Sequence, residues 1–206
     1  EAELDLEDHV IVAGYGQAAR YLVRVLSGSG IRFIITTLSP GGANEAEDEG
    51  LPVVRGDATR PFMLRHVGID RAKMLVIADD DPATAHRITS IARGLNPTMR
   101  IVVRTRYTAE VDSLAAAGAD IVIAEELESI VQLFAEVLRD YRVAPAEIES
   151  YEELARRNGY SAMFDPEEDT SVFKCETGDD CYDSRTVSLR SGMPVVGLTV
   201  GEIAHR

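Results

Sequence analysis

The sequence has few basic residues for its size. Its 206 residues include 21 Lys and Arg against 35 Asp and Glu, which gives a formal net charge of −14 at pH 7. A surface that binds DNA or RNA needs a basic face, so this balance argues against a nucleic-acid partner. It also argues against docking on an anionic membrane surface. A local positive pocket for a nucleotide stays compatible with it.

Cysteines and long apolar runs are scarce as well. Cys175 and Cys181 make no disulfide framework, which fits a cytoplasmic protein. Their spacing differs from that of a Cys-x-x-Cys metal site, so we expect loop thiols and no metal, with a redox-labile pair as the alternative. No stretch approaches 18 uninterrupted apolar residues, so we expect no membrane span. The acidic stretch 1–8 is unlike a signal peptide, and without an initial Met we expect a chain cut from something longer.

Runs rich in Val and Ile alternate with helical patterns through the first part of the chain. The expected strands are 10–13, 32–38, 52–55, 74–78, 100–105 and 120–124. Helical patterns follow each of them. This alternation predicts an α/β fold with a Rossmann-like, doubly wound, parallel six-stranded sheet.

Local signals add detail to three of the helices. In the first helix, the residues expected on one apolar face are Ala18, Tyr21, Leu22, Val25 and Leu26. The second helix is expected over 43–49, after a break at 39–42. Thr59 is a candidate N-cap for the third helix, with Phe62, Leu64 and Val67 facing inward.

The character of the sequence changes after Tyr141. We expect residues 1–141 to form the nucleotide-binding domain and 142–160 to form a linker that contains a polar helix over 146–158. Residues 161–206 are expected to form a truncated small α+β domain.

A glycine motif follows the first expected strand and opens a helix. Residues 14–19 read Gly14, Tyr15, Gly16, Gln17, Ala18, Ala19. Gly14 allows the tight turn, Gly16 lets a phosphate approach the backbone, and Ala19 lets helix and strand pack closely. The helix N-terminus then favours an anion. The alternative is a strand–helix turn that binds nothing.

Ligands of such sheets lie beyond the carboxyl ends of the strands. The further candidates there are Thr36, Thr37, Asp57, Ala58, Thr59, Ala78, Asp79 and Arg104. Thr36 or Thr37 stands where an acidic residue usually binds the ribose hydroxyls. Asp57 contacts the nucleotide or caps a turn with Thr59, and Arg104 reaches a phosphate or pairs with Asp79 or Glu125. Of the three acids 79–81, we expect one to cap the next helix.

Three stretches together resemble the RCK (TrkA-N, KTN) domains. They are 10–19, 50–59 (GLPVVRGDAT) and 117–120 (AGAD). Residues 185–206 loosely resemble the start of the companion RCK-C (TrkA-C) domain. Such domains regulate potassium channels, Trk/Ktr uptake systems and Kef-type antiporters at the cytoplasmic face of the membrane.

The resemblance implies a regulatory domain without enzymatic chemistry. It implies a ligand that is NAD(H), AMP, ADP or ATP, and a homodimer or higher assembly that pairs through 126–141 and 146–158. The membrane-embedded channel or antiporter belongs to the same chain or to a separate subunit. Thr37 departs from the acidic residue usual in the family, which puts NAD in doubt. An NAD(P)-dependent oxidoreductase and a dimerisation scaffold with a vestigial nucleotide site are the competing hypotheses.

Overall fold

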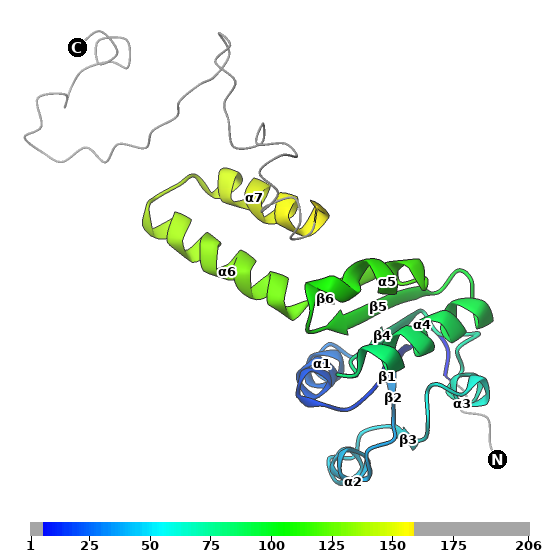
Figure 1. Ribbon diagram of the computed structural model, residues 1–206. Coiled ribbons are helices and arrows are strands. Elements are labelled where there is room, and N and C mark those ends of the chain that lie inside the picture. The colour runs from blue at the N-terminus through cyan, green and yellow to red at the C-terminus, as the bar shows by residue number, and fades with distance from the viewer. Residues whose placement is uncertain (1–5, 159–206) are drawn as a thin grey trace, which may run out of the picture. The chain divides into compact units, whose positions relative to one another are not determined.

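A single parallel sheet of six strands organises the first part of the chain. The computed structural model describes residues 6–158. The strand order is β3-β2-β1-β4-β5-β6 (Figure 1). The strands are β1 (Val10–Ala13), β2 (Phe33–Thr37), β3 (Val53–Arg55), β4 (Met74–Ile77), β5 (Arg100–Thr105) and β6 (Ile121–Ala124). The predicted Rossmann-like doubly wound sheet is therefore confirmed.

Helices connect the strands in sequence. They are α1 (Gln17–Gly28), α2 (Pro40–Asp48), α3 (Pro61–His66), α4 (Pro82–Leu95), the 3-10 turn η1 (Thr108–Glu110), α5 (Val111–Ala116), α6 (Glu125–Asp140) and α7 (Pro145–Asn158). The strand order reverses at β1, which pairs with β2 on one side and with β4 on the other. Ligands of such sheets bind outside the strand ends at this reversal.

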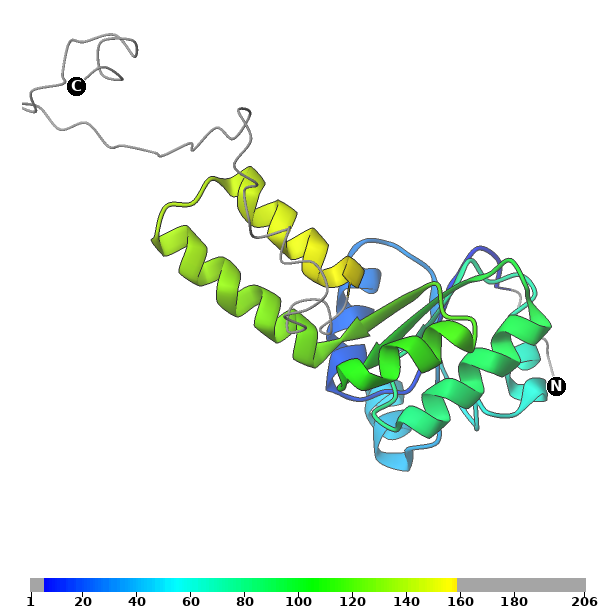
Figure 2. The ribbon, with the colours of Figure 1, turned by 45° about the horizontal axis from the view of Figure 1, so that its top comes forward.

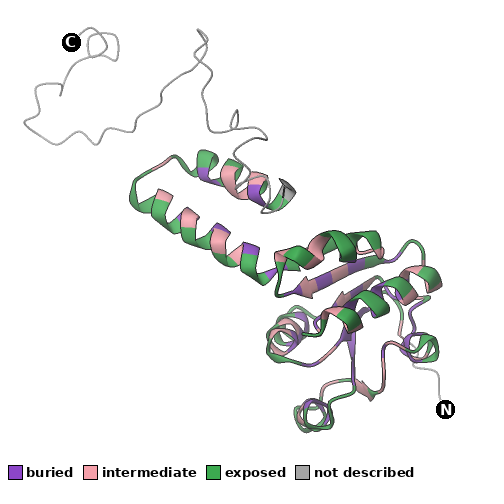
Figure 3. Cartoon of the chain, viewed as in Figure 1, coloured by how far each residue is buried: buried purple, intermediate pink, exposed green. Residues whose placement is uncertain are grey.

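Each face of the sheet has its own apolar core. On one face, β1 residue Ile11 and β4 residue Leu75 pack in a cluster with buried residues of α3, α4 and α5. On the other, β1 residue Val12 and β2 residue Ile35 pack in a cluster with α1 and α2. Successive strand residues point to opposite faces, so a strand covered on both sides is apolar throughout. Figure 3 shows the buried residues concentrated on the strands and on the inner sides of the helices.

The buried faces of α1 and α3 differ from those expected. In α1 the buried residues are Ala19, Val23 and Leu26, whereas Tyr21 and Val25 are 63% and 64% exposed. The helix carries two apolar stripes, one with Tyr21 and Val25 and one with Ala19 and Val23. The stripe with Ala19 packs on the sheet because this small side chain allows a closer approach. In α3, Phe62 is 60% exposed while Met63 and Leu64 are buried. Arg60 precedes α3 as N-cap, so the expected Thr59 cap is wrong.

The N-terminus of α2 lies three residues earlier than expected. The helix begins at Pro40, with Ser39 as N-cap. The Ser39 Oγ accepts a hydrogen bond from the Gly42 N–H at 3.2 Å. Proline is favoured in the first turn because its fixed φ suits a helix and its missing N–H is not needed there. Residues 39–42 (Ser-Pro-Gly-Gly) therefore form the N-cap and first turn of α2, where a break between strand and helix was expected.

The chain divides into two compact units, and the division falls within α6 between Ile130 and Val131. In the second unit, α7 follows α6 and lies alongside it (Figures 1 and 2). Arg139 of α6 and Glu152 of α7 form an ion pair at 3.4 Å. Within residues 6–158, no helix is long and apolar enough to cross a membrane. Residues 161–206, with Cys175 and Cys181, lie outside the described part of the chain, and the predicted domain boundaries stay predictions.

Candidate functional site

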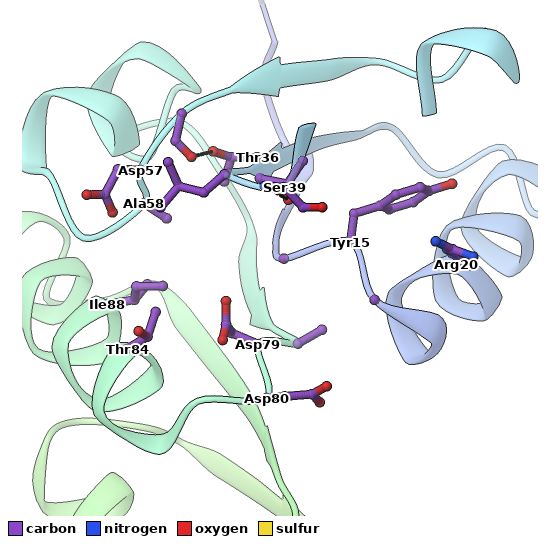
Figure 4. A pocket seen from close by; sticks show the side chains of 16 residues that line it. Tyr15, Arg20, Thr36, Ser39, Asp57, Ala58, Asp79, Asp80, Thr84 and Ile88 are labelled. Atoms are coloured by element: carbon purple, nitrogen blue, oxygen red, sulfur yellow. Dashed lines mark hydrogen bonds between the residues drawn. The ribbon is translucent and has the colours of Figure 1, made fainter. Parts of the chain in front are cut away.

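A pocket of about 400 Å³ lies at the carboxyl ends of β1, β2, β3 and β4. Its volume falls in the range of about 300–1,000 Å³ found for small-molecule sites. Figure 4 shows Thr36, Asp57 and Ala58 on one side of it and Thr84 and Ile88 on another. Of the predicted site residues, nine line it: Gly14, Tyr15, Gly16, Thr36, Thr37, Asp57, Ala58, Ala78 and Asp79.

The turn between β1 and α1 lines the pocket with Gly14, Tyr15 and Gly16. Gly14 has a φ of +93°, and a Cβ placed on it would lie 3.2 Å from the backbone carbon of Ala78. Both the left-handed backbone and the neighbouring strand thus favour glycine at this position. Gly16 is the N-cap of α1, and a Cβ added there would have no other atom within 4 Å. The backbone beside Gly16 is therefore open, and the first turn of α1 carries no acidic residue to oppose an anion.

A cation stands beside this turn. Arg20 lines the pocket, and its guanidinium carbon lies 5.7 Å from the centre of the Tyr15 ring. Nη2 of Arg20 forms a 2.5 Å ion pair with Glu45 of α2, and its buried Nε has no hydrogen-bond partner among residues 6–158. The Tyr15 side chain is itself buried, and this burial raises the pKa of its phenol. Arg20 supplies positive charge near the N-terminus of α1.

The end of β2 contributes hydroxyl groups. Thr37, the last residue of β2, is 6% exposed, and its Oγ1 accepts a hydrogen bond from the Ser39 N–H at 3.2 Å. The Thr36 hydroxyl donates to the Gly56 carbonyl at 3.4 Å. No carboxylate lies in the stretch from Thr36 to Gly42. This side of the pocket is therefore polar but uncharged.

Asp57 caps the turn that follows β3. This capping was one of the two roles expected for it, and contact with the nucleotide was the other. Its Oδ1 accepts hydrogen bonds from the N–H and the hydroxyl of Thr59, at 2.9 and 2.6 Å. The Thr59 hydroxyl bond is the main cause of a lowered pKa for this carboxyl. Because Asp57 also lines the pocket, capping and ligand contact are compatible.

The three acids after β4 have separate tasks. Asp81 is the N-cap of α4 and accepts from the Thr84 N–H at 2.8 Å. Asp79 accepts from the Asp81 N–H at 2.9 Å. Asp80 is bonded to Arg104 and also pairs with Arg106 at 3.2 Å. The predicted helix cap is thus Asp81.

Arg104 does not line the pocket, but it bonds Asp80, which does. Its guanidinium bridges Asp80 and Glu125, with Nε 2.6 Å from Oε1 of Glu125. The hydrogen bond from Arg104 is the main cause of a lowered pKa for Asp80. Arg104 therefore forms the ion pair with Glu125 that was one of the expected alternatives. Its second partner is Asp80, and not Asp79 as the other alternative proposed.

The predicted site residues and the residues that line the pocket differ in two ways. Five candidates do not line the pocket: Gln17, Ala18, Ala19, Thr59 and Arg104. Six lining residues were not predicted: Arg20, Leu38, Ser39, Gly56, Thr84 and Ile88. Asp80, which the strand-end rule places beside Asp79, also lines the pocket. Arg20, Thr84 and Ile88 belong to the first two turns of α1 and α4, where only the helical period after each strand end predicts that they reach the pocket. Across residues 6–158, no group of three or more His, Cys, Asp or Glu side chains could hold a metal ion.

Comparison with known families gives one match over the sheet. The TrkA-N domain family matches residues 10–125. This range covers all six strands and ends at the first residue of α6.

Individual relatives point the same way. A putative K⁺ efflux antiporter KefB of Alkalimonas amylolytica is 30% identical over 158 residues, covering 77% of this chain. The chain spans 24% of that relative's length. The TrkA-N domain of the Escherichia coli inner membrane protein YbaL superposes with a TM-score of 0.61 at 27% identity, covering 66% of this chain and 99% of that one. The AMP-bound C-terminal domain of Shewanella denitrificans Kef gives 0.59 at 29% identity, with coverages of 72% and 90%.

Proposed function

Because the chain belongs to the TrkA-N domain family, we propose that it is a nucleotide-binding regulatory domain of a potassium channel or cation/proton antiporter. It acts at the cytoplasmic face of the membrane and catalyses no reaction itself. The observation that carries the proposal is the open N-terminus of α1, which lies beside Gly16 in a pocket at the strand-order reversal. The AMP bound to the related Shewanella domain supports it.

The phosphate is proposed to bind at the first turn of α1. Gln17, Ala18 and Ala19 occupy the first three helical positions, where backbone N–H groups have no partner within the helix. These residues therefore act through their main chain, although their side chains do not line the pocket. Arg20 adds a cation at the same end.

The nucleoside is proposed to fill the rest of the pocket. Adenine fits between the Asp57–Ala58 wall and the apolar side chain of Ile88, which lie on different sides of the space in Figure 4. Asp57 can accept a hydrogen bond from the adenine amino group. The ribose then lies beside Thr37, at the end of β2.

Regulation requires that the ligand favour one arrangement of the domain over another. A chain of ion pairs connects Asp80, which lines the pocket, through Arg104 to Glu125, the first residue of α6. A phosphate close to Asp80 competes electrostatically for Arg104. We propose that this competition changes how firmly α6 is held at its N-terminus.

We propose that the chain forms a homodimer through α6, so that a change in how α6 is held alters the contact between the two copies. Val131 and Ala135 of this helix are buried, whereas Leu133, Val137 and Tyr141 are 69%, 51% and 80% exposed. These exposed residues recur every fourth position and form a second apolar stripe along the helix. A second copy that packs on this stripe would remove it from water.

Calorimetric titration of the chain with AMP, ADP, ATP, NAD and NADH tests the proposed function. We expect micromolar binding of at least one nucleotide, and its loss in Gly16→Asp, whose carboxylate would occupy the phosphate position. A folded protein that binds none of the five contradicts the proposal and favours the dimerisation scaffold. Hydride transfer from NADH to any substrate would favour the oxidoreductase instead.

A further inference from the structure

The ribose end of the pocket lacks the charge that usually distinguishes one nucleotide from another. In dinucleotide-binding sheets, an acidic residue about 20 positions beyond the glycine motif binds the ribose hydroxyls. Here that residue is Thr37, which lines the pocket and is only 6% exposed to solvent. A carboxylate at this position would repel a phosphate on the ribose, whereas a threonine hydroxyl can donate a hydrogen bond to it.

The start of α2 strengthens this difference. Because the helix begins at Pro40, its N-terminus lies directly after Thr37 and Ser39, both of which line the pocket. The first turn of α2 contains no acidic residue, so no carboxylate there opposes an anion. The Ser39 hydroxyl already accepts from the Gly42 N–H, and Pro40 has no N–H, so the free donor of this turn is the Gly41 N–H. A Cβ added to Gly41 would meet no atom within 4 Å, whereas one added to Gly42 would lie 3.4 Å from the Tyr15 carbonyl oxygen. The open side of this helix start is therefore at Gly41.

The carboxylates that do line the pocket are bound elsewhere. Asp57 is held by Thr59 and lies 3.5 Å from the Arg60 guanidinium. Asp80 is paired with Arg104. Asp79 accepts the Asp81 N–H. None of these three belongs to the stretch from Thr36 to Ser39 that lines the ribose end, so none replaces the absent acidic residue.

We propose that Thr37 sets the specificity of the site for an adenine nucleotide whose ribose carries a second phosphate, at the 2′ or 3′ position. The proposal rests on the nucleotide-binding function argued above and narrows its ligand class. The 5′-phosphate lies at the N-terminus of α1, and the ribose phosphate lies beside Thr37 and the N-terminus of α2. Nucleotides with two free ribose hydroxyls bind more weakly because they leave the second position without an anion.

Calorimetry with three small ligands tests the proposal on the intact chain. The ligands are AMP, adenosine 2′,5′-bisphosphate and adenosine 3′,5′-bisphosphate. We expect one bisphosphate to bind about tenfold more tightly than AMP at low salt, with the preference declining as ionic strength rises. The tighter of the two assigns the position of the ribose phosphate.

Two variants of nearly equal size separate charge from shape. Thr37→Asp is expected to weaken binding of the preferred bisphosphate at least tenfold while AMP binding is kept or improved. Thr37→Asn, which is neutral, is expected to keep the bisphosphate preference. If both variants unfold, the comparison of ligands on the unaltered chain still decides the matter.

The outcomes distinguish this inference from the function on which it rests. Binding of AMP that equals or exceeds that of both bisphosphates overturns the specificity of Thr37 and leaves nucleotide sensing intact. A Thr37→Asp variant that keeps the bisphosphate preference overturns it as well. If no nucleotide binds to the folded chain, the proposed function fails and this inference fails with it.

Discussion

Arg104 and Glu125 form a two-point ion pair that ties the end of β5 to the first residue of α6. Nε and Nη2 of the arginine lie 2.6 and 2.5 Å from the same carboxylate oxygen. The arginine side chain is 19% exposed, so water screens this pair less than it screens a pair on the open surface. Since Arg104 also bonds Asp80 in the pocket wall, one guanidinium serves both the ligand site and the helix.

Removing this guanidinium should weaken nucleotide binding through Asp80. In Arg104→Gln, the Asp80 carboxylate keeps only its longer pair with Arg106, so its negative charge acts more strongly on an incoming phosphate. We expect the dissociation constant for the best nucleotide to rise about tenfold, or ~1.4 kcal/mol. Calorimetry on the variant measures this change.

A double-mutant cycle identifies the route of the effect. Asp80→Asn alone should change affinity little, and in Arg104→Gln/Asp80→Asn it should restore most of the lost binding. If the double variant binds as weakly as Arg104→Gln, the arginine acts on the ligand by a path that does not involve Asp80.

The two glycines of the phosphate turn should respond differently to alanine. Gly14→Ala places a side chain at a φ of +93° and 3.2 Å from the backbone of Ala78, just after β4, so we expect a loss of about 1–3 kcal/mol in unfolding free energy. Gly16→Ala meets no atom and has an extended backbone, so the loss should stay below about 1 kcal/mol. Its methyl group, however, lies where the phosphate approaches, and binding should fall. Chemical denaturation and calorimetry on both variants check this; equal stability losses would contradict it.

The sequence predicts the sheet well because the central strands β1 and β4 are apolar throughout, and β1, β3 and β4 are followed within two residues by a glycine or an acid. Helix faces are harder to predict. Tyr21 and Val25 satisfy the helical period as well as Val23 does, and only packing against the sheet selects the latter. The start of α2 is missed because Ser39 and Pro40 serve equally in a turn and in a helix cap.

The candidate site divides in the same way. Residues at strand ends, such as Gly14 and Asp57, follow from the rule that ligands bind there. Arg20 and Ile88 belong to helices and reach the pocket only through the three-dimensional packing. Arg104 stands at a strand end, yet two carboxylates withdraw it from the pocket. Which anion pairs with Arg104, a carboxylate of the chain or a phosphate of the ligand, depends on distances that the sequence does not contain.

The exposed stripe on α6 should mediate self-association. Val137→Glu places a charge at its centre, beside Leu133 and Tyr141, and we expect the dimer dissociation constant to rise at least tenfold because a carboxylate would be buried without a partner. Sedimentation equilibrium measures it. Gln132→Glu, an exposed position outside the stripe, is the matched control and should leave the dimer intact. An unaltered chain that is monomeric at high concentration would contradict the proposed dimer.

His9 should make the fold sensitive to mild acid. The side chain is fully buried, and its Nε2 donates a 2.8 Å hydrogen bond to the Val67 carbonyl. A carbonyl only accepts, so Nε2 carries the proton and Nδ1 is the basic nitrogen, which is buried without a hydrogen-bond partner among residues 6–158. Burial is the main cause of a lowered pKa for His9, and the charges of Arg71 and Arg32 lower it further against the opposing effects of the Val67 carbonyl and Asp8.

The sign of the pH effect follows from these shifts. In the unfolded chain His9 titrates near about 6.5, while in the folded chain it stays neutral to lower pH. Below about pH 6.5 the unfolded state therefore binds the additional proton, and the unfolding free energy declines by at most about 1.4 kcal/mol per pH unit until the folded pKa is reached. Stability from this group is complete above about pH 6.5.

Denaturant titrations between about pH 8 and pH 5 measure this decline. In His9→Gln, whose amide can still donate to the Val67 carbonyl, the slope due to His9 should vanish while the pH dependence due to all other groups is kept. The difference between the two curves thus isolates one residue, whatever the absolute stability of the variant. Parallel curves would mean that His9 takes up its proton equally in both states. An NMR titration of the His9 ring in the unaltered chain gives an independent reading, because the midpoint of its titration should lie below the ordinary histidine pKa of about 6.5.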